Sequence, residues 1–260
     1  MKQAIRALSI AILILWVLTI VFSVTAVYSV MNLGIGFEEA QFFSSNEDVV
    51  LSLPFFINNR GYYDISELNV TTHVTNYNGT LLALSETFVP LVASGSNVET
   101  AHNISIDLND LFTGYTEFLF NDSSFELDAF ISLNFAYAIP VQMSINMTIP
   151  WGAPFSNLSI GEISVLPYNS THSKVVIPLS FENHSYFDVV GTIQLEVYND
   201  IDKLVTSGQT DLDVPSYHGY VGQVEMYLST GDLSKLTESG RIHLVFESPM
   251  FTAEQWITYG

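Results

Sequence analysis

The chain contains no cysteine among its 260 residues. This absence excludes disulfide bonds, thiolate metal ligands and thiol nucleophiles. Positive charge is also scarce, because 7 Lys and Arg stand against 27 Asp and Glu, for a formal net charge of −20. Such an acidic chain repels phosphate backbones and anionic lipid head groups, so we expect neither a nucleic-acid partner nor a peripheral lipid partner. With 48% hydrophobic residues, however, it has ample material for a packed core.

Signatures of catalysis are missing too. The sequence holds no Walker loop, no Gly-X-Ser-X-Gly motif and no Gly-X-Gly-X-X-Gly motif. Its histidines stand singly, without a His-Glu-X-X-His pair, at His73, His102, His172, His184, His218 and His243. We therefore expect no enzyme activity, no catalytic residue, no cofactor and no metal site.

Calcium is the metal that the sequence excludes least, because it takes oxygen ligands from flexible loops. Asn109 and Asp110 together with Asp122 form one candidate set, and the segment 199–202 forms a second. Asn and Asp are also common in turns for backbone reasons, and the second set falls at an expected hairpin. We favour turn residues over ligands.

An uncharged apolar run covers residues 7–31. It exceeds the roughly 20 residues that cross about 30 Å of hydrocarbon. Lys2 and Arg6 precede the run, and the next charged residue is Glu38. The positive-inside rule then predicts a cytoplasmic tail at 1–6, a transmembrane signal-anchor helix at 7–31 and an extracellular remainder.

Two other interpretations of this run stay open. Val24-Thr25-Ala26 offers small residues for signal-peptidase cleavage after Ala26, although a secretory apolar region usually has about 7–15 residues. Arg6-Ala7-Leu8-Ser9 resembles the leader-cleavage site of archaeal type IV pilins. In that case the apolar helix would form the core of a surface filament.

The remainder carries eight Asn-X-Ser/Thr sequons without proline in the middle position. We predict N-linked glycans at Asn69, Asn78, Asn103, Asn121, Asn146, Asn157, Asn169 and Asn183. Two of these asparagines stand between apolar residues, in 68–70 and 145–147. The period of two in a strand then turns both Asn side chains toward solvent.

The exterior part contains an internal duplication. Three pairs of matching segments recur in order at a spacing of about 125 residues: 32–36 with 157–161, 53–65 with 177–189, and Val89-Pro90 with Val214-Pro215. The segment 150–154 holds two prolines and a glycine, so it marks the boundary between the copies. We predict a first domain at 32–151 and a second at 152–260.

Each copy is typical of β structure. Apolar residues alternate with polar ones at 68–74 and 193–197, and an Asn-Gly dipeptide in 77–80 favours a tight hairpin. Short helical turns are expected at 108–112 and 231–236. The predicted fold is mainly β: an N-terminal transmembrane α-helix, then two tandem antiparallel β-sandwich domains of the Ig or fibronectin-III type.

The segment 176–208 resembles the LEA14/WHy domain (late embryogenesis abundant group 2; water stress and hypersensitive response). The shared pattern is a hydrophobic strand ending in Asn, an aromatic turn, alternating apolar residues, a hairpin and a glycine. The first copy shows the same order from Val50 to Ala83. The family's Asn-Pro-Asn is replaced by Asn58-Asn59-Arg60 and Glu182-Asn183-His184. The resemblance implies a two-sheet fold, no catalysis, no cofactor and a protective or interaction role.

The aromatic pairs Tyr62-Tyr63 and Tyr186-Phe187 recur in both copies. We expect one ring of each pair packed under a turn and the other exposed, rather than a ligand-binding platform. Together these observations predict a membrane-anchored extracellular glycoprotein without enzyme activity. Its partners would be the lipid bilayer through residues 7–31, N-linked glycans and other protein subunits, alike or unlike. A cysteine-free exterior points to a prokaryotic, archaeal cell surface.

Overall fold

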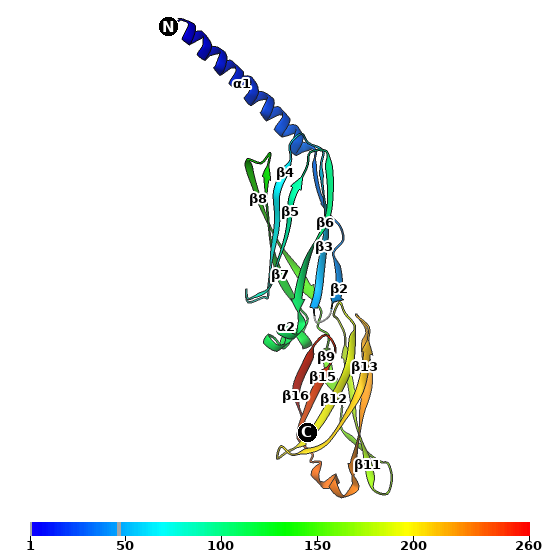
Figure 1. Cartoon of the computed structure of the whole chain (residues 1–260). Coiled ribbons are helices and arrows are strands. Elements are labelled where there is room, and N and C mark those ends of the chain that lie inside the picture. Colours follow the sequence, from blue (N-terminus) through cyan, green and yellow to red (C-terminus); the bar gives the residue numbers. More distant parts are fainter. Residues whose placement is uncertain (1, 46–47) are drawn as a thin grey trace.

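The computed structural model describes residues 2–45 and 48–260. It begins with the helix α1 (Lys2–Met31), which projects from the remainder of the molecule (Figure 1). At 1.5 Å per residue this helix is about 45 Å long, and it includes residues 2–6 of the segment expected as a tail. Its length and composition fit a single membrane span or a signal sequence.

Two antiparallel sheets form the first sandwich. In one sheet β3 (Asp48–Asn59) is central, with β6 (Ser96–Asp107) on one side and both β1 (Leu33–Phe37) and β2 (Gln41–Ser45) on the other. The other sheet has the order β5-β4-β7-β8, from the strands β4 (Ile65–Thr75), β5 (Leu81–Val92), β7 (Ser123–Phe135) and β8 (Ile139–Trp151).

The second sandwich repeats this arrangement strand for strand. One sheet pairs β11 (His172–Glu182) with β14 (Gly219–Ser229) on one side and with β9 (Ser156–Ile160) and β10 (Ser164–Pro167) on the other. The other sheet has the order β13-β12-β15-β16, from β12 (Val189–Asn199), β13 (Leu204–Val214), β15 (Gly240–Glu247) and β16 (Thr252–Tyr259). The predicted fold of a helix followed by two duplicated β-sandwiches is confirmed.

The hairpin turns of the two copies are built alike. The side-chain oxygen of Asn76 accepts the backbone N–H groups of Asn78 and Thr80, and Gly79 has a φ of 77°. The side-chain oxygen of Asn199 accepts the N–H groups of Ile201 and Lys203 in the same way. The candidate calcium segment 199–202 is therefore a hairpin turn that its own side chain organises.

Short helices lie at one end of each sandwich, where the chain crosses from one sheet to the other after β6 or β14. They are α2 (Leu108–Gly114) and α3 (Glu117–Phe120) in the first copy, and the 3₁₀ helix η1 (Thr230–Lys235) in the second. Both helical turns were expected from the sequence. Asp107 caps α2, because its side chain accepts the N–H of Asp110.

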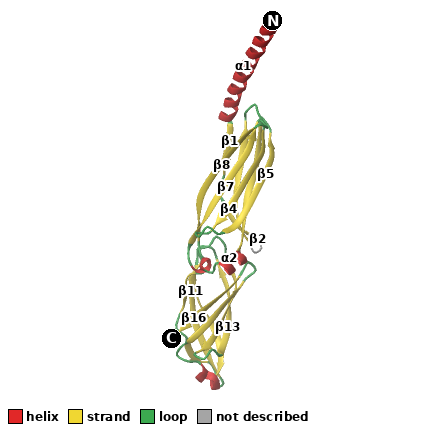
Figure 2. Cartoon of the chain, turned by 90° about the vertical axis from the view of Figure 1, so that its left-hand side faces the viewer, coloured by secondary structure: helices red, strands yellow, loops and turns green. Residues whose placement is uncertain are grey.

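The junction between the sandwiches is a packed aromatic core. Trp151, at the end of β8, donates its indole N–H to the Phe118 carbonyl at 2.9 Å. Phe155, in front of β9, contacts Phe181 and Phe246 of the second sandwich, with ring centroids 4.9 and 5.0 Å apart. Buried residues of both sandwiches thus belong to one continuous hydrophobic cluster. The two sandwiches stand end to end in both views (Figures 1 and 2).

Gly152 lies at the closest approach in this junction. A Cβ atom built on it would stand 1.8 Å from the backbone oxygen of His184, which cannot move without shifting the β11–β12 loop. We predict that Gly152→Ala lowers the free energy of unfolding by about 1–3 kcal/mol, as overpacking does. Denaturant unfolding measures the change.

Gly114→Ala is the matched control, because a Cβ there meets nothing within 4 Å. It should change stability by less than about 0.5 kcal/mol. Equal effects of the two substitutions would contradict the tight junction.

Candidate interaction site: two repeated aromatic loops and the sequons

A buried asparagine begins the same loop in each sandwich. Asn59 ends β3, and its Nδ2 donates to the backbone oxygens of Tyr63 and Val92 at 2.9 and 3.1 Å. Asn183 follows β11, and its Nδ2 donates to Phe187, Val214 and Pro215 at 2.9, 3.2 and 3.1 Å. Each asparagine thereby ties its own aromatic loop to the turn at the end of β5 or β13.

An aspartate supports the same tie in both copies. Asp64 accepts the backbone N–H of Ser94 at 2.7 Å, and Asp188 accepts that of Ser216 at 2.8 Å. The Tyr137 hydroxyl also donates to Asp64, and these two hydrogen bonds, the Ser94 N–H above all, lower the pKa of the Asp64 carboxyl. We call this set of hydrogen bonds, made by Asn59 and Asp64 in the first copy and by Asn183 and Asp188 in the second, the brace. The sequence duplication repeats it in both sandwiches.

In the first sandwich this loop holds the helix α1. The backbone N–H of Tyr62 donates to Ser29 Oγ at 2.8 Å, and the hydroxyls of Tyr63 and Thr25 lie 2.7 Å apart. The Tyr62 ring stacks on Tyr28, with centroids 5.0 Å apart. A Cβ on Gly61 would come within 2.6 Å of Ser29, so only glycine allows this approach.

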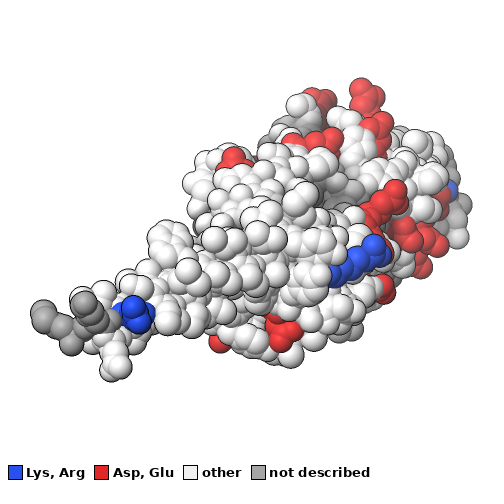
Figure 3. All heavy atoms as spheres, turned by 90° about the horizontal axis from the view of Figure 1, so that it is seen from above, with Lys and Arg blue, Asp and Glu red and all other residues white. Residues whose placement is uncertain are grey.

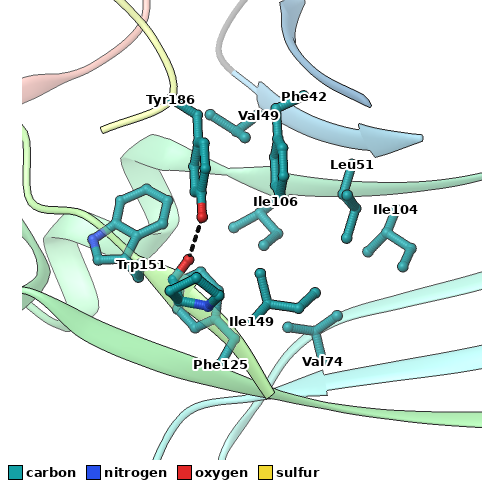
Figure 4. A pocket seen from close by; sticks show the side chains of 11 residues that line it. Phe42, Val49, Leu51, Val74, Ile104, Ile106, Phe125, Ile149, Trp151 and Tyr186 are labelled. Carbon is teal, nitrogen blue, oxygen red and sulfur yellow. Dashed lines mark hydrogen bonds between the residues drawn. The ribbon is translucent and has the colours of Figure 1, made fainter. Parts of the chain in front are cut away.

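In the second sandwich the equivalent loop holds the first sandwich. Tyr186 donates its hydroxyl to the Pro150 carbonyl at 2.8 Å, and its ring stacks on Phe42 with centroids 4.0 Å apart (Figure 4). Phe187 lies behind it against Trp151. A cavity of only about 20 Å³ remains among these side chains. Each loop therefore packs against the part of the chain that precedes its own sandwich, which is α1 in the first copy and the first sandwich in the second.

The prediction for the aromatic pairs is correct for the first copy and half correct for the second. Tyr63 is packed and Tyr62 is 65% exposed, as expected. Phe187 is buried, but Tyr186 is half-buried in the junction rather than exposed. The difference arises because a sandwich covers the second loop, whereas only a helix end covers the first.

A histidine adds a charged contact to the junction. The ring of His184 lies between two carboxylates, with Nδ1 2.7 Å from Asp122 Oδ2 and Nε2 2.9 Å from Glu182 Oε2. These hydrogen bonds, the one to Asp122 above all, raise the pKa of His184, and His184 lowers the pKa of Glu182. The sequence alone could not pair Asp122 with a histidine 62 positions away.

The second histidine of note is His102, which is buried on β6. Its two ring nitrogens lie 2.8 Å from the hydroxyls of Thr72 and Thr87. Burial lowers the pKa of His102 because it penalises the imidazolium form. Nothing in its sequence surroundings distinguishes His102 from the exposed histidines.

The other calcium candidates are engaged elsewhere. Asn109 accepts the backbone N–H of Thr252, and Asp122 accepts that of Ala153 while it contacts His184. Across residues 2–45 and 48–260 the structure brings together no group of three His, Asp or Glu side chains suited to a metal ion.

Seven of the eight predicted glycosylation sites have accessible or half-accessible side chains. Those that are exposed are Asn78, Asn103, Asn121, Asn146, Asn157 and Asn169. Asn69 is half-buried, and its Nδ2 donates to Glu86 at 2.6 Å. Glycosylation at these positions stays a prediction.

Asn183 differs from the other seven positions. Its side chain is 0% exposed, and its amide hydrogens are used in the brace, so the folded chain offers no nitrogen to a glycan. The first copy explains why: Asn59 makes the same contacts although Asn59-Arg60-Gly61 is not a sequon. The amide of Asn183 thus has the same structural role as that of Asn59, and a glycan on it would require these hydrogen bonds to break.

The brace generates a direct prediction. Asn183→Ala leaves buried carbonyls without donors, so it should lower the free energy of unfolding by about 1–3 kcal/mol. Asn59→Ala should do the same. Calorimetry or denaturant unfolding measures both effects.

Asn97→Ala is the control, because this side chain is exposed on β6 and stands outside any sequon, and its effect should stay below about 0.5 kcal/mol. Peptide mapping of the native protein should find Asn183 without a glycan. A glycan on Asn183, or a neutral Asn183→Ala, would contradict the brace.

Comparisons with known proteins give a fold likeness only. No protein-family model matches the sequence, and no curated protein matches it. Red sea bream transglutaminase is 13% identical over 87% of this chain, with a TM-score of 0.32, and a glycosyl hydrolase family 2 member from Bacteroides cellulosilyticus is 8% identical over 84%, with a TM-score of 0.31. The chain spans 31% and 29% of their lengths. The periplasmic chaperone SfaE is 12% identical, with 87% and 98% of the two chains covered and a TM-score of 0.29. Scores this low carry no argument about function.

Proposed function

We propose that this protein is a membrane-anchored extracellular glycoprotein without enzyme activity. It would act as a structural or interaction component of the cell surface, or as an accessory subunit of a membrane assembly. One observation carries the proposal: the two sandwiches are joined end to end into one rod by packed, hydrogen-bonded contacts, and further hydrogen bonds attach α1 to the inner end of that rod. Such a rod would hold its outer end at a set distance from the membrane.

The dimensions suit this role. The longest strands of the first sandwich have 13 residues, which at about 3.3 Å per residue gives roughly 40 Å along the rod. The second sandwich adds its own length beyond the junction. A partner bound to the outer sandwich is thereby held well clear of the bilayer.

The junction between the sandwiches is filled by side chains and is not itself a ligand site. The junction cavity is about 20 Å³ and its lining is almost wholly apolar, whereas enzyme and cofactor sites usually have about 300–1,000 Å³ with convergent polar groups. The resemblance to the LEA14/WHy family stays a prediction, because many unrelated families share the β-sandwich fold.

The exposed sequons suggest one use for glycans. Asn146 lies in the middle of β8, which is the edge of its sheet and would otherwise be open to pairing with another chain. Pro140 and Pro150 near the two ends of β8 cannot donate to a further strand either. A sugar at Asn146 would shield the remaining edge.

Protease treatment of intact native cells tests the proposal. We expect added protease to digest both sandwiches while a short N-terminal fragment stays protected in the membrane. Sandwiches that survive on intact cells but are cut after lysis would contradict the orientation.

Mass spectrometry of the mature N-terminus separates the remaining alternatives. An intact start at residue 1 or 2 supports the anchor. A chain that starts at Leu8 supports the filament subunit, in which α1 is a polymer core, and a chain that starts at Val27 supports a cleaved signal.

A further inference from the structure

An apolar groove of about 480 Å³ opens on the side of the first sandwich next to α1. Four residues from the last turns of α1, two from β1, three from β7 and three from β8 line it, and all twelve are apolar. Because the lining offers no charged or polar side chain, the groove cannot orient a polar ligand. Its chemistry suits a hydrocarbon chain.

The second sandwich is an internal control for this groove. The inward face of β16 carries Ala253, which is 6% exposed, followed by the polar Gln255. The inward face of β8 carries Val141 and Met143 instead, which are 45% and 48% exposed. The equivalent strand β16 thus completes the second sandwich with one small and one polar side chain at these positions. The fold itself therefore does not require aliphatic side chains on the inward face of β8.

The groove is continuous with the apolar surface of α1. Twenty residues counted from Ala7 end at Ala26, so the last turns of α1 lie at the outer boundary of the hydrocarbon. These same turns form one wall of the groove. The helix also leans over the side on which β8 lies (Figure 1). With α1 along the membrane normal, the β7–β8 hairpin tilts toward the bilayer.

The side chains around the groove fit a membrane surface. Tyr28, Tyr62 and Tyr137 are exposed at this end of the sandwich, and tyrosine is enriched at the level of lipid headgroups. In the view from the helix end, uncharged atoms surround the base of α1, and acidic side chains lie mainly further out (Figure 3). Two acidic side chains lie at this end, Asp64 bonded to the Tyr137 hydroxyl and Glu67 bonded to Asn134, but the groove lining itself contains none.

A second copy of the chain fits less well. The strands run along the rod, so two copies anchored in one membrane can bring their β8 edges together only in parallel (Figure 1). The antiparallel pairing that a two-fold axis across the strands would allow puts the two helices on opposite sides.

We propose that the groove between the last turns of α1 and the β7–β8 hairpin binds an acyl chain of an outer-leaflet lipid. The first sandwich is then seated in the membrane surface rather than merely tethered above it. This inference rests on the proposed function, because it requires that α1 spans the membrane with the sandwiches outside.

Because the sequence contains no cysteine, a thiol-reactive label attaches at the one cysteine that is introduced. Val141→Cys places a small fluorophore in the groove, and Gln142→Cys places it at the same depth on the opposite face of β8. Leu13→Cys reports on α1 itself. The full chain is reconstituted in nanodiscs whose phospholipids carry brominated acyl chains, and melting temperatures verify that each variant is folded.

We expect the bromolipids to quench the label at Val141→Cys at least threefold more than the label at Gln142→Cys, and to quench Leu13→Cys strongly. Equal, weak quenching at 141 and 142 with strong quenching at 13 would overturn the groove inference alone. Weak quenching at all three positions would overturn the membrane span and with it the proposed function. Spin–spin broadening between nitroxides at 141, without lipid quenching, would assign the groove to a second copy.

Discussion

The architecture depends on a buried asparagine amide placed at the start of one loop in each sandwich. Asn59 and Asn183 donate to backbone carbonyls of the aromatic loop and of the last residue of β5 or β13, and they hold the loop against the turn at the same end of the sandwich. Because buried carbonyls need hydrogen-bond donors, these contacts hold the aromatic loop in one conformation. The loop then presents its aromatic side chains to the segment that precedes the sandwich.

Duplication explains how one loop serves two purposes. In the first copy, glycine at 61 lets Ser29 of α1 approach the loop backbone. In the second copy, Tyr186 reaches Phe42 and the Pro150 carbonyl across the junction. The same brace therefore attaches a helix in one place and a sandwich in the other. A rod results because neither attachment relies on a free linker.

Much of this could be predicted because it is local or repeated in the sequence. The apolar run, the matching segments near 53 and 177, the period of two in the strands and the Asn-Gly turn each report on a few neighbouring residues. The role of Asn183 could not be predicted, since Asn183-His184-Ser185 matches a sequon and only the fold shows the amide to be buried. A comparison with Asn59 was the one available signal.

Other features depend on contacts between distant segments. The pairing of His184 with Asp122, the burial of His102 between two threonines and the uncovered face of β8 all follow from how the sheets pack. Met147 illustrates the limit: alternation places it inward, yet it is 47% exposed on β8, the edge strand of its sheet. Periodicity predicts on which face of the sheet a side chain lies, but not whether another part of the chain covers it.

The central claim is that the braced loops make the two sandwiches one stiff body. Nitroxide labels at Leu84→Cys on β5 and Leu204→Cys on β13, both exposed positions, report the distance between the sandwiches by pulsed electron spin resonance. A single narrow distance distribution that broadens when Asn183→Ala is added is the result expected. A broad distribution in the doubly labelled chain without that substitution would contradict the account.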